Sequence, residues 1–137
     1  MTSIENFEVG QKGSLTKTFT EDDVKAFAEI SLDKNPIHLD EEYAKNSIFK
    51  KRVVHGILQS GLISAVLGNK LPGEGSIYRE QNLTFKKPAF IGDTLTALVE
   101  VLEIKERIGL LILKTTVTNQ DGQLLIDGTA KGLVPKN

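Results

Sequence analysis

The stretch of sequence that decides the fold is HGILQSGLISAVLGNKL, residues 55–71. Its apolar residues fall on most of the circumference of a helix, and a helix that is apolar on most sides belongs in a protein core. Small residues recur along it at Gly56, Ser60, Gly61 and Ser64. They leave one face of the helix with short side chains, which another backbone or a ligand can approach closely. We therefore predict a long, buried central helix.

The chain on the C-terminal side of this helix is rich in strand formers. Strands are expected over four segments separated by turn residues, at 77–85, 94–104, 110–118 and 124–134. Apolar and polar residues alternate around Val99, Glu100 and Val101, as in a sheet with one face on a core and the other in solvent. One buried helix followed by long strands in meander order predicts an antiparallel sheet wrapped around that helix, an α+β fold. Such a sheet leaves an edge and one flank of the helix uncovered, and a second copy can cover both, so we predict a homodimer.

Two shorter helices are expected ahead of the central helix. Thr20 can cap the first, because three acidic residues follow it and apolar residues then recur at helical spacing up to Ile30. Pro36 ends this region in a loop, since proline pushes the preceding Asn35 out of the α conformation. Asp40 can cap the second short helix.

Length and composition narrow the class of protein. The chain of 137 residues fits one domain, 1–137, and no stretch approaches a membrane span. It has no cysteine, which excludes disulfides and thiolate nucleophiles, and its net charge of −1 argues against a nucleic-acid-binding surface. Its first residues include acids and lack the apolar segment that precedes signal cleavage, so we expect a cytoplasmic protein.

The residues best suited to chemistry lie in DKNPIH, residues 33–38. Asp33, Asn35 and His38 bring a carboxylate, an amide and an imidazole into one short loop that Pro36 stiffens. An imidazole titrates near physiological pH, and a neighbouring carboxylate can exchange a proton with it through water, which suits general acid–base catalysis. The same spacing also fits a turn that ends a helix, in which Asp33 and Asn35 bond backbone amides and His38 fills space. Spacing alone does not choose between the two.

The hexapeptide resembles the D-x-N-P-x-H motif of the MaoC-like (R)-specific enoyl-CoA hydratases. Further similar stretches are FEVGQK at 7–12, HLDEEYAK at 38–45, VVHGILQSGLISAVLG at 53–68 and LPGEGSIYREQNLTFKKPAFIGDTL at 71–95. The resemblance covers nearly the whole chain and is strongest to the short hydratases associated with polyhydroxyalkanoate. It implies a homodimeric hot-dog fold that adds water to trans-2-enoyl-CoA to give (R)-3-hydroxyacyl-CoA, with no metal or other cofactor.

The same resemblance assigns roles to individual residues. Asp33 and His38 form the catalytic pair, which shares one water molecule, and Asn35 helps to fix the loop. Gly56 matches the residue whose backbone N–H receives the thioester oxygen. A helix start suits that role, because its free amides and its dipole favour negative charge. His55, next to Gly56, is expected to support the structure rather than to take part in the chemistry.

Two residues further along the helix are candidates for binding the acyl chain. Ser64 matches a position that lines the acyl pocket, although a small residue on a packed helix is also common for packing alone. Leu67 lies three residues beyond Ser64 and can share its helix face. A leucine there can close the pocket after a few carbons, so we expect short acyl chains.

Positive charge near the predicted site is a candidate for binding coenzyme A. Lys51 and Arg52 precede Gly56 closely, and Lys86 and Lys87 follow a predicted strand. We expect part of this charge to contact the phosphates of coenzyme A, although exposed charge runs without a partner are equally common. A metal held by Asp33, His38 and Asp40 lacks the spacing typical of a zinc helix and is not predicted.

The sequence is also compatible with three other functions. A hot-dog thioesterase binds the same thioesters, but the intact D-x-N-P-x-H loop argues against it. A non-catalytic acyl-CoA-binding module is disfavoured by the joint presence of Asp33, Asn35 and His38. A 3-hydroxyacyl-carrier-protein dehydratase would use the same chemistry on another carrier, and nothing in the sequence separates the two carriers.

Overall fold

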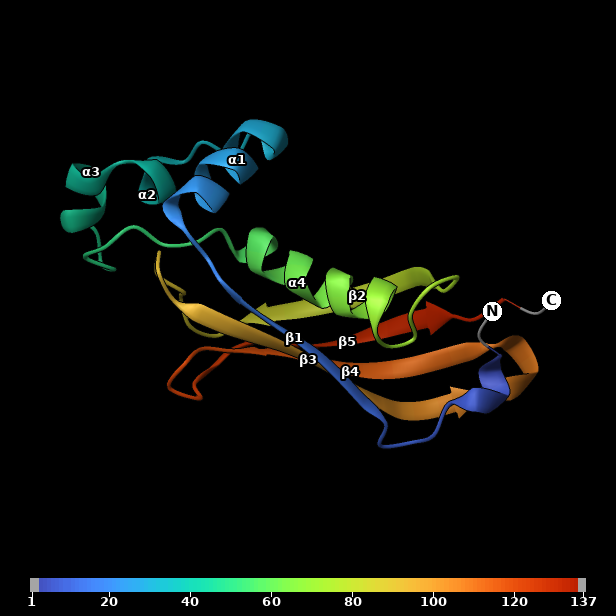
Figure 1. The fold of residues 1–137 in the computed structure, drawn as a ribbon. Coiled ribbons are helices and arrows are strands. Elements are labelled where there is room, and N and C mark those ends of the chain that lie inside the picture. The colour runs from blue at the N-terminus through green and yellow to red at the C-terminus, as the bar shows by residue number, and fades with distance from the viewer. Residues whose placement is uncertain (1–2, 136–137) are drawn as a thin grey trace.

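A five-stranded antiparallel sheet packs against the central helix α4 (Gly56–Asn69) in the computed structural model, which describes residues 3–135 (Figure 1). The strands, in chain order, are β1 (Lys12–Thr18), β2 (Ile77–Phe85), β3 (Thr94–Lys105), β4 (Leu110–Thr118) and β5 (Leu124–Leu133). Their order in the sheet is β1-β3-β4-β5-β2. The α+β fold, the central helix and the four predicted strands are confirmed.

Two features of the sheet differ from the prediction. The meander order is wrong, because β2 pairs with β5 at one edge instead of with β3. β1, at the other edge, was not predicted, because its sequence KGSLTKT is mostly polar. β1 is held by its pairing with β3, where threonine hydroxyls bond across the strands, Thr16 with Thr96 at 2.9 Å and Thr18 with Thr94 at 2.7 Å.

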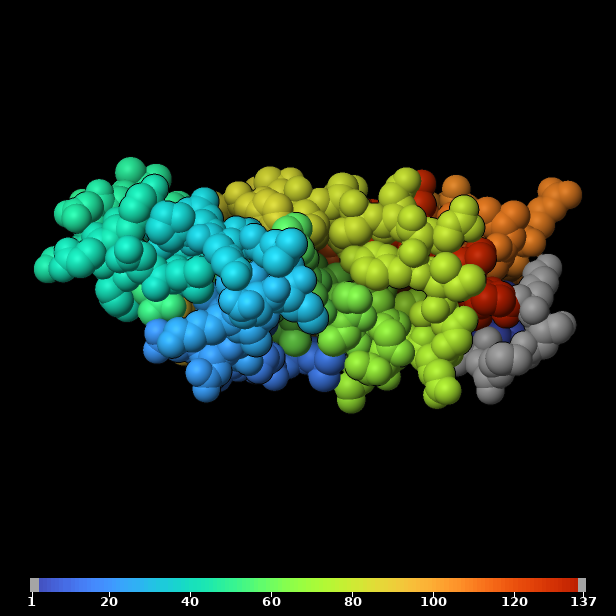
Figure 2. Space-filling model, turned by 90° about the horizontal axis from the view of Figure 1, so that it is seen from above, coloured from blue at the N-terminus to red at the C-terminus, as the bar shows by residue number. Residues whose placement is uncertain are grey.

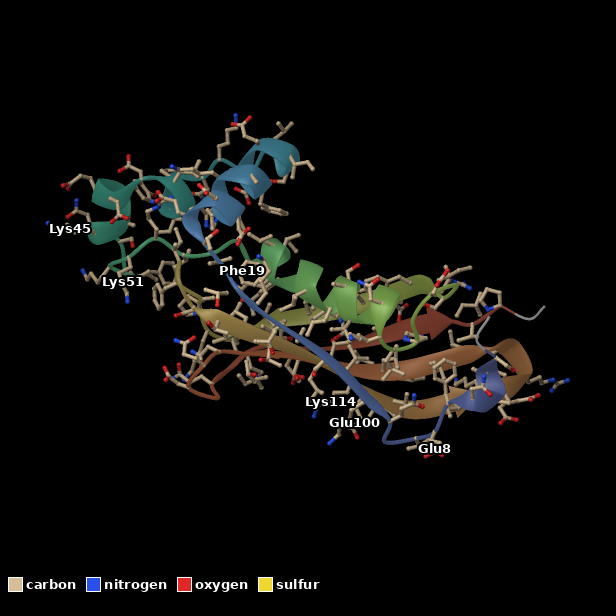
Figure 3. All side chains as sticks on the ribbon, viewed as in Figure 1. Glu8, Phe19, Lys45, Lys51, Glu100 and Lys114 are labelled. Atoms are coloured by element: carbon tan, nitrogen blue, oxygen red, sulfur yellow. The ribbon has the colours of Figure 1, made fainter. Side chains whose placement is uncertain are left out.

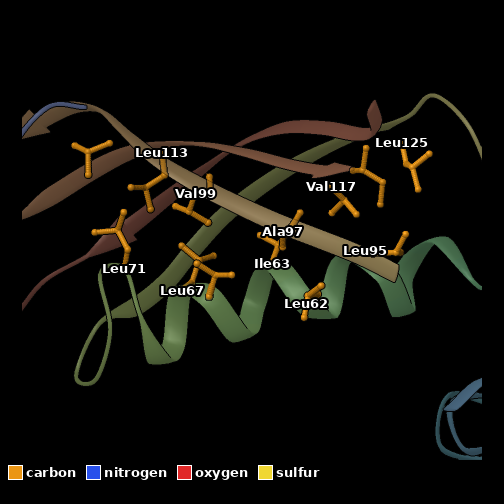
Figure 4. Close-up of a cluster of buried hydrophobic side chains, with 14 of the residues drawn as sticks. Leu62, Ile63, Leu67, Leu71, Leu95, Ala97, Val99, Leu113, Val117 and Leu125 are labelled. Atoms are coloured by element: carbon orange, nitrogen blue, oxygen red, sulfur yellow. The ribbon is translucent and has the colours of Figure 1, made fainter. Parts of the chain in front are cut away.

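The core lies between α4 and the inner face of the sheet. Figure 4 shows Ile63 and Leu67 of α4 directed at strand residues such as Val99, all of them buried. The alternation predicted on β3 is confirmed, since Val99 and Val101 are fully buried whereas Glu100 points away from α4 (Figure 3). The helix is not covered on all sides, because Ile57 is exposed.

Three short helices, α1 (Glu21–Ser31), α2 (Pro36–Leu39) and α3 (Glu41–Lys45), precede α4. Both predicted caps are confirmed: Thr20 Oγ1 accepts from the Asp23 amide, and Asp40 Oδ1 accepts from the Tyr43 amide. α2 was not predicted as a helix. It begins at Pro36 because the fixed φ of proline and its missing N–H suit the first helical position.

These three helices gather at one end of the molecule, beyond the start of α4 (Figures 1 and 2). They therefore carry the 33–38 loop to the N-terminal end of the central helix. Two short 3-10 segments, Ile4–Asn6 and Glu106–Ile108, complete the described elements. Within residues 3–135, no helix is long and apolar enough to cross a membrane.

Candidate active site

The loop that links α1 to α2 is fixed by a chain of local hydrogen bonds. α1 ends at Leu32 in the left-handed conformation, with φ of 68°, and the Ser31 hydroxyl then accepts from the Asp33 amide at 3.1 Å. The Asp33 carboxylate accepts from the Asn35 amide at 3.3 Å, and the Asn35 side chain caps α2 by accepting from the Ile37 amide at 3.2 Å. Asn35 thus lies where it can fix the loop, between the two residues of the predicted pair.

His38 is held by its ring as well as by its backbone. Its side chain is 9% exposed, and its Nδ1 lies 2.7 Å from the carbonyl oxygen of Val53. A carbonyl oxygen can only accept, so Nδ1 is the nitrogen that donates, and in the neutral ring Nε2 carries a lone pair. This lone pair can accept a proton.

His55 lies directly behind His38. It is 1% exposed, its ring is stacked on the His38 ring with centroids 3.8 Å apart, and Phe27 of α1 contacts it edge-on at 4.7 Å. Its Nε2 donates to the Asp33 carbonyl oxygen at 3.0 Å. Burial lowers the pKa of His55, and the hydrogen bond to the Asp33 backbone opposes that shift only in part, so the ring is neutral at physiological pH.

The polar atoms of three side chains meet at this point. One oxygen of Asp33 and one ring nitrogen each of His38 and His55 lie within 4.8 Å of one another. Asp40, the third ligand considered from the sequence, caps α3 instead. The set considered from the sequence, Asp33 with His38 and Asp40, is therefore not brought together.

A cavity of about 520 Å³ opens beside this cluster. Asp33, His38 and Gly56 all lie in its wall, so the structure brings the predicted pair and the start of α4 to one space. The other residues in its wall are Ile37, Phe49, Val53, Val54, Ile57, Gln59, Phe85, Lys86, Lys87 and Pro88.

Gly56 is the first residue of α4, so its N–H has no partner within the helix. The ring of Phe85 lies against it: a β-carbon added at position 56 would come within 2.6 Å of Phe85 Cε1. Only glycine therefore fits there without displacing that ring. Gly56 itself lies in the wall of the cavity.

Gln59 is a cavity residue that the sequence reasoning missed. Its side chain is 3% exposed, and its amide nitrogen donates to the Val54 carbonyl oxygen at 3.2 Å. Its oxygen Oε1 has no hydrogen-bond partner among the described residues. A carboxamide inside an otherwise apolar stretch of helix was the signal available in the sequence.

Ser64 and Leu67 do not line this cavity in the single chain. They lie together in the wall of a second, smaller cavity of about 90 Å³, which also includes Pro72 and Tyr78. Gln59 and Ser64 are five residues apart on α4, which corresponds to about 7.5 Å along a helix axis. The two cavities therefore lie at different positions along the axis of α4.

The predicted phosphate-binding residues are placed differently from one another. Arg52 is buried: its Nε donates to the His38 carbonyl oxygen at 2.8 Å, and its guanidinium pairs with Glu21 at 2.7 Å. This hydrogen bond lowers the pKa of Glu21. Arg52 is thus no surface cation, and its contacts favour support of the His38 loop over a phosphate contact. Lys51 lies over the Phe90 ring at 4.5 Å and outside the cavity wall, which contains Lys86 and Lys87 instead.

Comparison with known proteins places the chain in a family. The MaoC like domain family matches residues 6–122. The (R)-specific enoyl-CoA hydratase of Rhodospirillum rubrum is 46% identical over 131 residues, which cover 96% of this chain and 90% of that protein. The (R)-specific enoyl-CoA hydratase of Aeromonas caviae is 44% identical over 97% of this chain and 99% of its own.

Solved structures agree with the sequence match. The (R)-hydratase of A. caviae involved in polyhydroxyalkanoate biosynthesis superposes with a TM-score of 0.93 over 96% of this chain and 99% of that chain, at 44% identity. The R-hydratase PhaJ1 of Pseudomonas aeruginosa gives a TM-score of 0.92 at 41% identity, over 98% of this chain and 86% of that chain. Both matches confirm the hot-dog fold expected from the resemblance. The chain belongs to the MaoC-like domain family.

Proposed function

We infer that the chain is an (R)-specific enoyl-CoA hydratase, a hydro-lyase that adds water across the double bond of a trans-2-enoyl thioester. The observation that carries this conclusion is the pairing of the Asp33 carboxylate with the His38 ring, within 4.8 Å, in the wall of a cavity that also contains the start of α4. Two acceptors at that separation can hold one water molecule between them.

The proposed reaction starts from that water molecule. Its oxygen bonds to the β-carbon, and one of its protons passes to the Asp33–His38 pair, where His38 Nε2 is free to accept because Nδ1 donates to Val53. The electrons of the double bond move towards the thioester carbonyl, whose oxygen becomes negative. The pair then returns the proton to the α-carbon, the carbonyl reforms, and the product is a 3-hydroxyacyl thioester.

Gly56 supplies the second half of the proposed machinery. Its free N–H, at the positive end of the α4 dipole, is the donor for the negative thioester oxygen. Acid–base groups contribute about 10² to 10⁴ in rate, and one oxyanion donor about 10² to 10³. Neither half suffices alone, so the loop and the helix start have to act together.

We propose coenzyme A as the carrier, with its phosphates near Lys86 and Lys87. These two lysines lie in the cavity wall next to Phe85 and Pro88, whereas Arg52 is buried and paired. The acyl chain would run in the opposite direction, from Gly56 along α4 towards Ser64 and Leu67. Short acyl chains remain the expectation, because the second cavity is small and the buried Leu67 lies in its wall.

The proposed active form is a homodimer. β2 is an edge strand whose residues are mostly exposed, including the apolar side chains of Ile77, Tyr78 and Phe85. Pairing with a second copy would cover this edge and, with it, the exposed flank of α4 at Ile57. A monomeric mass in sedimentation equilibrium of the active protein would contradict this proposal.

The reaction itself is tested by mixing the purified protein with crotonyl-CoA in the absence of added metal or nucleotide. We expect the absorbance of the conjugated enoyl group to fall, no free thiol to appear, and (R)-3-hydroxybutyryl-CoA to form. Release of free thiol would identify a thioesterase, and no change in either signal would indicate a binding module. Activity on crotonyl-carrier protein but not on crotonyl-CoA would keep the chemistry and change the carrier.

A further inference from the structure

His55 connects the parts of the site that come from different segments of the chain. Its Nε2 donates to the Asp33 carbonyl oxygen at 3.0 Å, and its ring is stacked on His38 at 3.8 Å. The next residue in the chain is Gly56, whose N–H is the proposed oxyanion donor. The buried His55 side chain thus contacts both members of the acid–base pair. His55 also directly precedes Gly56, whose amide is the third group of the proposed site.

The hydrogen-bond chemistry fixes which form of His55 makes these contacts. The Asp33 carbonyl oxygen can only accept, so the proton of the neutral ring is on Nε2. Nδ1 then carries a lone pair, and it is buried without a hydrogen-bond partner in the described part of the chain. The groups that face the ring are Asp33, His38 and Phe27.

A second proton on the His55 ring would destabilise its contacts with Asp33 and His38. It would create an N–H at Nδ1, which has no acceptor, and a positive charge on the ring directly beside His38, which has to take up a proton during the proposed reaction. The exposed Asp33 carboxylate would offset this only in part, because solvent screens it. The site therefore requires His55 in its neutral form.

His55 is not among the residues in the wall of the catalytic cavity. It has no place from which to touch substrate, so its contribution has to act through the groups that do. We propose that His55 is a positioning residue that, as a neutral Nε2–H donor, holds the Asp33–His38 pair in place relative to the Gly56 amide. This inference rests on the roles assigned to those three residues under the proposed function.

Two substitutions separate the hydrogen bond from the packing. His55→Gln keeps an N–H donor for the Asp33 carbonyl and removes the aromatic ring, whereas His55→Phe keeps a ring against His38 and removes the donor. We expect His55→Phe to lower kcat for crotonyl-CoA about 10²-fold with KM little changed, since a misplaced catalytic group can cost that much. His55→Gln should retain kcat within about tenfold of the wild type.

Phe27→Leu is the matched control, because Phe27 contacts the same ring from α1 and lies outside the cavity wall. It should lower the thermal midpoint and leave kcat near that of the wild type. Equal losses of kcat in Phe27→Leu and His55→Phe, or a His55→Phe enzyme as active as the wild type, would overturn the positioning role. A wild-type protein without hydratase activity would instead defeat the proposed function, so the two failures are distinguishable.

A readout that does not depend on activity is available, because the chain has only two histidines. Labelling with ¹⁵N-histidine gives two ring systems in the NMR spectrum. We expect one ring protonated at Nε2, assigned to His55 by its loss in His55→Gln, and the other protonated at Nδ1. A His55 ring that carries its proton on Nδ1, or on both nitrogens, at neutral pH would overturn the proposal. If neither of the two rings carried its proton on Nε2 alone, the proposal would be overturned even if the variants failed to fold.

Discussion

The imidazole rings of His38 and His55 are stacked, with their centroids 3.8 Å apart and their planes inclined by 25°. They bond to the main chain through different nitrogens, His38 through Nδ1 to Val53 and His55 through Nε2 to Asp33. Two protonated rings at this separation would repel strongly in a partly buried site. A charge on His55 is therefore disfavoured, since burial already lowers its pKa and its ring is stacked on His38.

The lowered pKa of His55 predicts how stability depends on pH. The unfolded chain binds a proton at this histidine below about pH 6.5, while the folded chain resists it, so the free energy of unfolding falls as pH decreases through that range. His55→Phe removes this contribution. Between pH 7 and pH 5, urea unfolding should show a smaller loss of stability for His55→Phe than for the wild type. Equal losses would show that His55 does not titrate differently in the folded state.

Removal of either member of the acid–base pair should abolish most of the turnover. We expect Asp33→Asn and His38→Ala to lower kcat at least about 10²-fold, because positioned acid–base groups contribute that much. Asp40→Asn is the matched control, since asparagine can still cap α3 and Asp40 is outside the cavity wall. Near-native turnover in either variant at an unchanged thermal midpoint would remove the residue from the catalytic pair.

A side chain at position 56 should disturb the oxyanion donor. Gly56→Ala forces the Phe85 ring to move, so kcat/KM for crotonyl-CoA should fall about tenfold or more. The double variant Gly56→Ala, Phe85→Leu should recover part of the loss, because it makes room for the new methyl group. At Gly61 of the same helix a β-carbon meets nothing within 4 Å, so Gly61→Ala should keep full activity. A fully active Gly56→Ala enzyme contradicts the assignment.

Truncation of Leu67 should change the acyl chain length that the enzyme accepts. Leu67→Ala would enlarge the second cavity along α4, so the ratio of kcat/KM for C8 to that for C4 enoyl-CoA should rise. Loss of a buried leucine side chain should also destabilise the fold by roughly 2 to 5 kcal/mol. Leu62→Ala makes the same chemical change at a buried α4 residue that lines neither cavity. If both variants give the wild-type ratio, Leu67 does not limit chain length.

The lysines in the cavity wall should contribute to binding of the carrier. Lys86→Ser with Lys87→Ser should raise KM for crotonyl-CoA, with a smaller effect at high salt, and should leave KM for a crotonyl thioester without the nucleotide unchanged. Lys51→Ser provides the comparison, because Lys51 lies over Phe90 outside the wall. An increase in KM that is confined to Lys51→Ser would restore the phosphate contact predicted from the sequence.

The caps of α1 and α3, the central helix and most of the strands could be predicted from the sequence, because they depend on neighbouring residues. A cap such as Thr20 bonds an amide three residues away, and the alternation along β3 reports the face of a single strand. The 33–38 loop is local in the same sense, since Asn35 and Pro36 shape it within a few residues. β1 escaped prediction because its sequence is mostly polar and it is held by pairing with β3, which is distant in the chain.

The tertiary structure alone decided which of these local pieces meet. The position of β2 beside β5 follows from pairing between segments far apart in the chain, for which no local pattern exists. From the sequence, Arg52 is expected to be a surface cation. In the folded chain it is buried, and it bonds to Glu21 and to the His38 carbonyl oxygen. The hydrogen bond between His55 and Asp33 joins residues 22 positions apart in the chain. It forms only when the loop between α1 and α2 packs against the start of α4. The sequence by itself determined which residues are suited to the proposed chemistry. Folding decided which residues hold them in place, because the supporting contacts are long-range.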